Sequence, residues 1–172
     1  MRLKTCLLVF MVMALIITLV PTLSSADEYK YEGPPAFTVT YPEGSKPDSN
    51  IDPGNVWSIR TPKNVSVRVR VVPIPEGLEL KDAAEKWYLP RAKKAVGTSV
   101  WMDDNQEITL SDGTKAYYFE ITWYYAGSPV DRLRIVSMVV VVFKDGKLVE
   151  VEAHPWDNFS ASEKIVKSLK FQ

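Results

Sequence analysis

Cysteine and histidine are almost absent from this sequence, and neither sign of charge prevails. Cys6 is the only cysteine, His154 is the only histidine, and 21 basic residues balance 21 acidic ones. Because Cys6 lies in the N-terminal segment, the rest of the chain has no disulfide, no thiol nucleophile and no thiolate metal site. Stability must therefore come from a hydrophobic core, and 172 residues suffice for one core and one domain.

Common catalytic and nucleotide-binding motifs are missing as well. The sequence contains no Gly-x-Ser-x-Gly elbow and no phosphate-cradling glycine loop, and His154 would have to be the base for any nucleophile. A hydrolase that uses two carboxylates stays open as an alternative, because such pairs assemble from distant positions. We therefore expect a protein that is not an enzyme and needs no cofactor.

The first 26 residues have the pattern of a secretory signal. Arg2 and Lys4 precede a strongly apolar stretch, which is interrupted by Pro21 and followed by small residues. We expect cleavage before Asp27 and hence a secreted or periplasmic protein. The alternative is an uncleaved membrane anchor, because the apolar stretch approaches the roughly 20 residues that span a bilayer.

Cleavage would leave a mature chain with a small acidic excess. It removes two basic residues and leaves 19 against 21 acidic ones, a formal charge of −2. No basic excess then remains to bind nucleic acid or anionic lipid. We expect no nucleic-acid partner, and contact with a membrane only through an uncleaved N-terminal segment.

The mature chain is expected to consist of a short polar lead at 27–35 and one domain at 36–172. The first two expected strands are separated by a stretch at 42–55 that is dense in Pro, Gly, Asp and Ser, which predicts a loop. The segments with the pattern of β-strands are 36–41, 56–60, 64–72, 106–111, 114–125, 132–144 and 147–154.

Two helices are expected among these strands. Apolar residues recur at helical spacing over 80–97, and Pro90 predicts a kink or a break near Leu89, because proline removes a backbone hydrogen bond inside a helix. A second helix is expected over 160–169, where Ser160 begins a capping-box pattern.

Two Asp-Gly pairs, at 112–113 and 145–146, predict two-residue hairpin turns in which both central residues have positive φ. The first turn would place Ile108 opposite Tyr117. In the strand before the second turn, apolar residues fall on both parities over 136–143, which predicts a strand covered on both faces. Together the segments predict an α+β fold with a mainly antiparallel central sheet of six to seven strands.

The aromatic run KAYYFEITWYY is divided in two by strand alternation. Tyr117, Phe119 and Trp123 share the face of Ile108 and are expected to fill the core. Tyr118 and Tyr124 lie on the opposite face and are the aromatic residues of the run that could meet a ligand. We favour sheet packing over ligand stacking, because aromatic residues are enriched in strands.

Glu150, Glu152 and His154 are expected to share one face of the last strand, and the second hairpin turn would place Glu150 opposite Val141. Two carboxylates and an imidazole could hold a divalent metal ion or form an acid-base pair. The alternative, which we favour, is that these charges mark an exposed edge strand and discourage pairing with other chains.

Four motifs resemble the PsbP-like superfamily: the opening FTVTYPEG, the helical LKDAAEKW, the hairpin LSDGTKAYYFEITWYYAG and the ending ASEKIVKSLKF. That group includes the extrinsic PsbP subunit of the photosynthetic oxygen-evolving complex, Ran-binding nuclear proteins and many secreted bacterial proteins. The resemblance implies an α/β/α sandwich with one long helix mid-chain and one C-terminal helix, and it transfers no catalytic residue. Ser45, where the family often has tryptophan, and the short lead weaken a photosystem assignment.

The sequence as a whole favours a non-catalytic binding or interaction module with a protein or cell-envelope component as its partner. Loops on a rigid sheet commonly carry recognition, so the contacts are expected near the loop at 42–55 and on the mixed face of the sheet. The alternatives are a binder of a small ligand or divalent metal ion and a cell-envelope hydrolase. The candidate contact residues are Tyr118, Tyr124, Arg132 and Arg134.

Overall fold

The computed structural model describes residues 25–48, 54–96, 100–125, 133–155 and 158–172. Every helix in these ranges is too short or too polar to span a membrane. The elements in chain order are β1 (Ala26–Tyr31), β2 (Phe37–Pro42), β3 (Lys46–Pro47), β4 (Asn55–Arg60), β5 (Ser66–Pro73), the 3-10 helix η1 (Leu80–Asp82), the π-helix η2 (Ala83–Tyr88), α2 (Leu89–Val96), β6 (Val100–Thr109), β7 (Lys115–Tyr125), β8 (Leu133–Lys144), β9 (Lys147–His154), α3 (Phe159–Lys167) and β10 (Lys170–Phe171).

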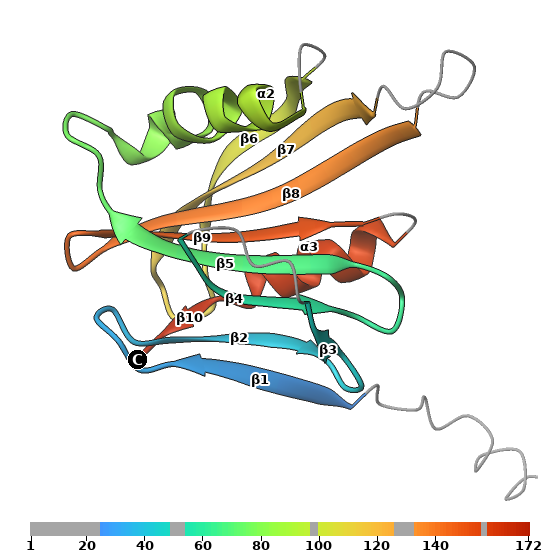
Figure 1. The fold of residues 1–172 in the computed structure, drawn as a ribbon. Helices are drawn as coiled ribbons and strands as arrows, with labels where there is room; N and C mark the ends of the chain where they lie inside the picture. Colours follow the sequence, from blue (N-terminus) through green and yellow to red (C-terminus); the bar gives the residue numbers. More distant parts are fainter. Residues whose placement is uncertain (1–24, 49–53, 97–99, 126–132, 156–157) are drawn as a thin grey trace, which may run out of the picture.

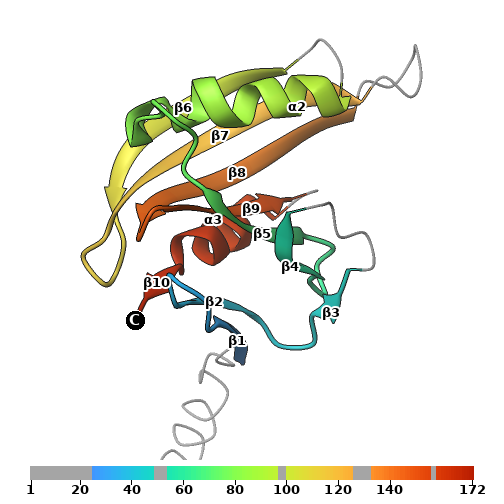
Figure 2. The same cartoon turned by 60° about the vertical axis from the view of Figure 1, so that its left-hand side comes forward.

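A seven-stranded antiparallel sheet forms the centre of the molecule, with the strand order β3-β4-β5-β9-β8-β7-β6. Helix α2 lies across one face of this sheet, and α3 lies on the other face (Figure 1). A second sheet of three strands, β1-β2-β10, packs on the side of α3 (Figure 2). The predicted α+β architecture with helices on both sides of an antiparallel sheet is confirmed.

The valine-rich strand β8 contributes to two separate cores because its side chains alternate between the faces of the sheet. Val140 and Val142 pack with α3 and the small sheet, whereas Val139 and Val141 pack with the helix on the opposite face. All four side chains are fully buried. The sequence prediction of a strand covered on both faces is therefore correct.

The helix on the α2 side changes type beside Pro90 instead of breaking. Before Leu89 it is a π-helix, in which the backbone N–H of Leu89 donates to the carbonyl of Ala84, five residues back. Pro90 is the second residue of α2, and the backbone of Leu89 before it stays helical, with φ −57° and ψ −40°. The expected irregularity near Leu89 is therefore present as a π-to-α transition, and the two helical segments run on continuously.

The two Asp-Gly hairpins differ. Asp145 and Gly146 both have positive φ, and Lys144 pairs with Lys147, so this two-residue turn forms as predicted. The other turn is longer by one residue, because the N–H of Leu110 donates to the carbonyl of Thr114. Its register therefore shifts, and Ile108 lies opposite Ala116 instead of Tyr117.

Asp112 explains the longer turn. One oxygen of its carboxylate accepts a hydrogen bond of 2.8 Å from the N–H of Thr114, and the other accepts one of 2.6 Å from the N–H of Phe171 in β10. Burial raises the pKa of this carboxyl, but the backbone hydrogen bonds lower it by more, and the net pKa lies below its ordinary value. The side chain thus joins the hairpin to the C-terminal strand.

Two chain segments differ from their sequence predictions. Helix α3 begins one residue earlier than expected, and its cap is Asn158, whose side chain accepts from the N–H of Ala161, instead of Ser160. Residues 26–31, expected to be mostly a polar lead, form strand β1, in which Tyr29 stacks on Trp57 at 4.4 Å between ring centroids. The aromatic contact explains why this polar segment is ordered against the domain.

Candidate binding site: an arginine-lined cleft between helix α2 and the central sheet

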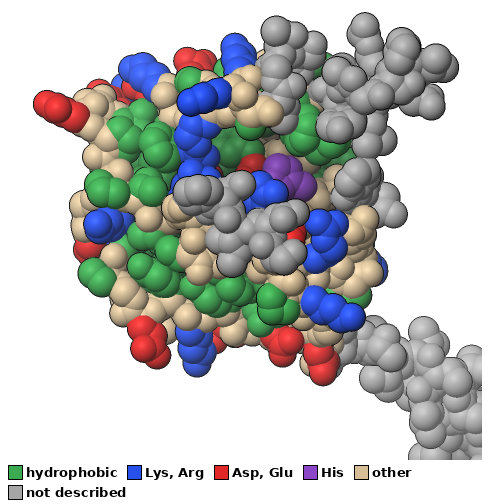
Figure 3. Space-filling view, viewed as in Figure 1, with side chains coloured by type: hydrophobic (Ala, Val, Ile, Leu, Met, Phe, Trp, Pro, Cys, Tyr) green, Lys and Arg blue, Asp and Glu red, His purple; other side chains and the backbone are tan. Residues whose placement is uncertain are grey.

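A cleft of about 360 Å³ opens between helix α2 and the adjoining face of the central sheet. The space-filling view shows the histidine in a hollow beside Lys and Arg atoms (Figure 3). Strands β4, β5 and β9 contribute most of the polar lining, and α2, β7 and β8 contribute most of the apolar lining. The arginines that line the cleft are Arg60, Arg68, Arg70 and Arg91.

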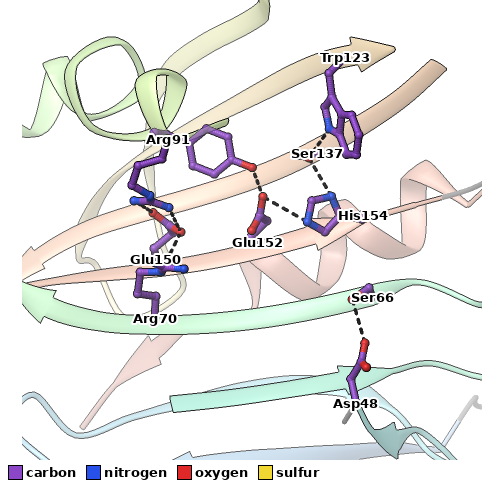
Figure 4. A network of polar contacts seen from close by, with 10 residues as sticks. Asp48, Ser66, Arg70, Arg91, Trp123, Ser137, Glu150, Glu152 and His154 are labelled. Atoms are coloured by element: carbon purple, nitrogen blue, oxygen red, sulfur yellow. Dashed lines mark hydrogen bonds and ion pairs between the residues drawn. The ribbon is translucent and has the colours of Figure 1, made fainter. Parts of the chain in front are cut away.

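An ion pair joins helix α2 to the floor beside the cleft (Figure 4). Arg91 donates to both carboxylate oxygens of Glu150, at 2.8 and 3.0 Å, and the indole N–H of Trp87 adds a bond of 2.9 Å. The guanidinium of Arg91 lies 4.3 Å from the Trp87 ring centroid. Glu150 is 2% exposed, so its hydrogen bonds come from these partners instead of from water.

Glu152 is the second buried carboxylate on strand β9, and it lines the cleft. Its Oε1 atom lies 3.2 Å from Nε2 of His154 and accepts a hydrogen bond from the hydroxyl of Tyr88. Burial raises the pKa of this carboxyl, but His154, Arg68 and Arg70 lower it by more, so the net pKa lies below its ordinary value. Glu152 is therefore held in its charged form.

The other nitrogen of the imidazole is engaged as well. Nδ1 of His154 lies 2.9 Å from Oγ of Ser137, and Ser137 accepts a bond of 3.3 Å from the indole N–H of Trp123. When the serine hydroxyl donates to Nδ1, the imidazole proton lies on Nε2, which donates to Glu152. Each donor of Trp123, Ser137 and His154 then has an acceptor. Ser137 is fully buried, so its hydroxyl positions the imidazole and is closed to a substrate in the cleft.

The two ends of the cleft differ in chemistry. On the β5 side it is lined by Ser66, Arg68 and Arg70, whereas on the far side it is lined by Trp123 of β7 and Ile135 of β8. Strands in a sheet lie about 4.8 Å apart, and β5 and β7 are separated by β9 and β8, so about 14 Å separates the two walls. The cleft can therefore hold a charged group and an apolar group at the same time.

The predicted metal residues share one face of β9, as expected, and Glu150 lies opposite Val141. The favoured explanation of an exposed edge strand is wrong, because β9 lies between β5 and β8 in the middle of the sheet. The structure brings Glu152 and His154 together but directs Glu150 to Arg91. In the described ranges, no group of three or more His, Cys, Asp or Glu residues is arranged to hold a metal ion.

The aromatic candidates are distributed differently from the prediction. Tyr118 is 2% exposed in the core on the α3 side, where Nζ of Lys167 lies 4.3 Å from its ring centroid, so it is not a surface contact. Tyr117, expected in the core, is only partly buried. Arg132 lies outside the described residues, and the side chains of Tyr124 and Arg134 do as well.

Sequence reasoning missed the arginines of β5 and assigned Trp123 to the core alone. A signal was present, because the alternation of Arg68 and Arg70 along one strand matches that of Glu150 and Glu152 along another. In the structure these residues face each other across the β5 and β9 pair, Arg70 opposite Glu150 and Arg68 opposite Glu152. Complementary charge on two strands predicts that they are neighbours.

No protein-family model matches this sequence, and comparison with curated proteins finds no match. Solved structures do match. Cyanobacterial PsbP from Synechocystis sp. PCC 6803 aligns with a TM-score of 0.66 and 16% identity, over 90% of this chain and 96% of that protein. The Ran-binding protein Mog1p of Saccharomyces cerevisiae aligns with a TM-score of 0.59 and 13% identity, over 86% and 95%.

A protein from Bacteroides thetaiotaomicron VPI-5482 aligns with a TM-score of 0.52 and 12% identity, over 87% of this chain and 49% of its own. At such identities the likeness concerns the fold alone. The chain has the PsbP-like fold that its motifs predict.

Proposed function

We propose that this protein is a secreted or periplasmic, non-catalytic binding module that recognises a protein or cell-envelope partner through the arginine-lined cleft. The observation that carries the proposal is the cleft itself, which is lined by arginine side chains and Trp123 together with the buried Glu152 and the half-buried His154. Arginine and tryptophan are the residue types that dominate recognition sites. A rigid sheet positions them, which favours binding without rearrangement.

The fold neighbours support a role in recognition. Mog1p is described as a Ran-binding protein, so one protein with this fold binds another protein. We propose for this chain the same kind of role, recognition of a partner, and do not propose that its partner is Ran. The N-terminal pattern of Arg2, Lys4 and the apolar stretch supports export.

The arrangement of the polar residues favours binding over hydrolysis. A pair of catalytic carboxylates must reach the substrate from both sides of the bond to be cleaved. Glu152 lines the cleft, but Glu150 is held by Arg91 and Trp87. Ser137, His154 and Glu152 have the composition of a nucleophilic triad, yet the serine is buried.

Site-specific photo-crosslinking tests the binding role. A benzophenone side chain at Ala95, an exposed residue of α2 that lines the cleft, should capture a partner from cell-envelope extract. The matched control is the same side chain at Ser160, an exposed residue of α3 on the opposite face of the sheet. Capture that is confined to Ala95 and lost in Arg70→Gln supports the proposal, and equal capture at both positions contradicts it.

Export is tested separately with residues 1–26 fused to a phosphatase that is active only outside the cytoplasm. Activity in the fusion, and its loss when Arg2 and Lys4 are replaced by glutamate, supports secretion. An inactive fusion that accumulates in the cytoplasm contradicts secretion without affecting the binding role.

A further inference from the structure

We infer that the cleft takes a carboxylate attached to an apolar body, of the kind that a peptide with a bulky apolar C-terminal residue presents. This inference rests on the proposed function in placing recognition at the cleft, and it adds the chemical class of the group that enters. The same chemistry occurs in a free small carboxylate, and the experiment below distinguishes the two sources.

Arg70, at the basic end of the cleft, is incompletely bonded. Its Nε atom is buried without a hydrogen-bond partner among the described residues, because its nearest carboxylate oxygen, on Glu150, is 3.7 Å away. Since Nε has almost no exposed surface, a ligand in the cleft would meet the guanidinium at its terminal nitrogens, which can only donate. Arg60 and Arg68 line the cleft as well, so an anionic acceptor suits this end.

Asn55 and Ser58 lie beside the cleft arginines without lining the cleft. They lie opposite Arg70 and Arg68 in the β4 and β5 pair, and Nδ2 of Asn55 and Oγ of Ser58 are buried without a hydrogen-bond partner in the described ranges. These closed atoms offer no contact to a ligand, so its recognition at this end depends on the arginines. A carboxylate supplies two oxygens that can accept several hydrogen bonds, and guanidinium groups match its planar geometry.

The apolar end of the cleft defines the second half of the ligand. Trp123 and Ile135 line the wall that faces away from β5, and Ala92 and Ala95 of α2 cover it. The Trp123 ring lies edge-on to His154, with 6.5 Å between centroids, so it is fixed in place. An aromatic or aliphatic side chain fits between these surfaces, and a volume of about 360 Å³ lies in the range of small-ligand pockets.

The apolar wall separates a carboxylate ligand from inorganic phosphate. Glu152 lies on β9, between the basic wall and the apolar wall, and its lowered pKa keeps it charged. A dianion such as phosphate meets twice the repulsion from Glu152 and twice the attraction of the arginines that a monoanion meets. The preference for a carboxylate therefore rests on Trp123 and Ile135, which inorganic phosphate cannot contact as an apolar group does.

Calorimetric titration of the mature chain with four probes tests the inference. The probes are acetyl-Gly-Gly-Phe with a free carboxylate, the same peptide as its C-terminal amide, octanoate and inorganic phosphate. We expect the free acid to bind and the amide to bind at least about tenfold more weakly, as for the loss of one charge-assisted hydrogen bond. Arg70→Gln should weaken the acid by a similar factor, whereas Lys115→Gln, on β7 outside the cleft lining, should not.

A second pair of variants covers the case in which Arg70→Gln fails to fold. Ala95→Glu adds a negative charge at an exposed residue of the cleft wall and should weaken the free acid. Ser160→Glu adds the same charge at an exposed residue of α3 and should leave binding unchanged. Trp123→Leu should weaken the acid, and Trp101→Leu, on the edge strand β6, should not.

Each outcome has a defined meaning. Binding of the peptide acid but not octanoate supports a C-terminal carboxylate, and the reverse supports a free small carboxylate. Equal binding of acid and amide, binding of phosphate as tight as that of the acid, or no binding of any probe at millimolar concentration overturns the inference. If crosslinking at Ala95 still captures a partner in that last case, the proposed function stands and only the ligand class fails.

Discussion

Arg91 binds both carboxylate oxygens of Glu150, and this pair fastens helix α2 to strand β9 in the centre of the sheet. The pair also separates the two buried glutamates of β9. Glu150 is committed to holding the helix, and Glu152 is left to line the cleft. The geometry of the cleft therefore depends on a residue of α2 that lies at its edge.

Arg91→Gln should destabilise the protein by about 3 kcal/mol, because it leaves the buried Glu150 without its principal partner. Urea unfolding measures the change. Lys94→Gln, an exposed residue on the same helix, should change the free energy of unfolding by less than about 0.5 kcal/mol. Equal effects of the two substitutions would show that the ion pair contributes no more than surface charge.

Glu152 should make stability depend on pH in acid. Its pKa in the folded state is lower than the ordinary value of 4.5, so its stabilisation is complete above that value and is lost as the pH falls through the folded pKa. Glu152→Gln should cost about 2 kcal/mol at pH 7, and the difference from the parent protein should shrink below pH 4.

Free energies of unfolding measured between pH 3 and pH 7 check this prediction. Glu76→Gln, at an exposed position, is the control and should follow the parent protein throughout. A constant difference between Glu152→Gln and the parent protein across this range would contradict a lowered pKa.

Asp112 should stabilise the protein more than the aspartate of the other hairpin turn. Asp112→Asn replaces an acceptor of two backbone N–H groups with an amide that can accept through one oxygen only, so we expect a loss of about 1.5 kcal/mol. Asp145→Asn keeps a residue that tolerates positive φ and should be nearly neutral. Thermal unfolding of the two variants compares them, and a larger effect at Asp145 would refute the prediction.

Tyr118 should matter for stability and not for binding. Tyr118→Ala removes a fully buried ring from the core on the α3 side and should cost about 3 to 5 kcal/mol. Tyr117→Ala, at the partly buried neighbour, should cost less. Chemical denaturation gives both values, and Tyr118→Phe provides a folded variant in which unchanged partner capture is expected.

Tyr118 should also resist ionisation. Burial, and after it the hydrogen bond to Glu120, raise the pKa of its hydroxyl above the ordinary value of 10.0. Because the folded pKa is higher than the unfolded one, the stabilisation is present below pH 10 and declines above it. Burial also raises the pKa values of Tyr29 and Tyr41, so absorbance at alkaline pH should show fewer tyrosines titrating near pH 10 in the folded parent protein than in the unfolded chain. In Tyr118→Phe this difference should be smaller by one tyrosine.

The aromatic run shows what strand alternation can and cannot predict. Alternation correctly predicts that Phe119 and Tyr118 face opposite sides of β7, because side chains of a strand alternate. It does not predict that both sides are covered, since that depends on the positions of α2 and α3. The error in the 112–113 turn has a similar cause, because Asp112 accepts a hydrogen bond from Phe171, which is distant in sequence.

The sequence by itself determined the features that depend on neighbouring residues. These are the irregularity of the helix beside Pro90, the tight turn at 145–146, the burial of β8 on both faces and the common face of Glu150, Glu152 and His154. Each follows from backbone sterics or from the period of a strand.

Only the tertiary structure decided the environment of those residues. Strand order placed β9 in the middle of the sheet beside the arginines of β5. Helix α2 supplied Arg91 for one glutamate, and η2 supplied Tyr88 for the other. Such pairings form between segments far apart in the chain. They are favoured because these strand neighbours bury apolar side chains on both faces of the sheet. The same carboxylates that an edge strand would expose to water are therefore enclosed with arginines beneath helix α2, and Glu152 becomes part of the cleft lining.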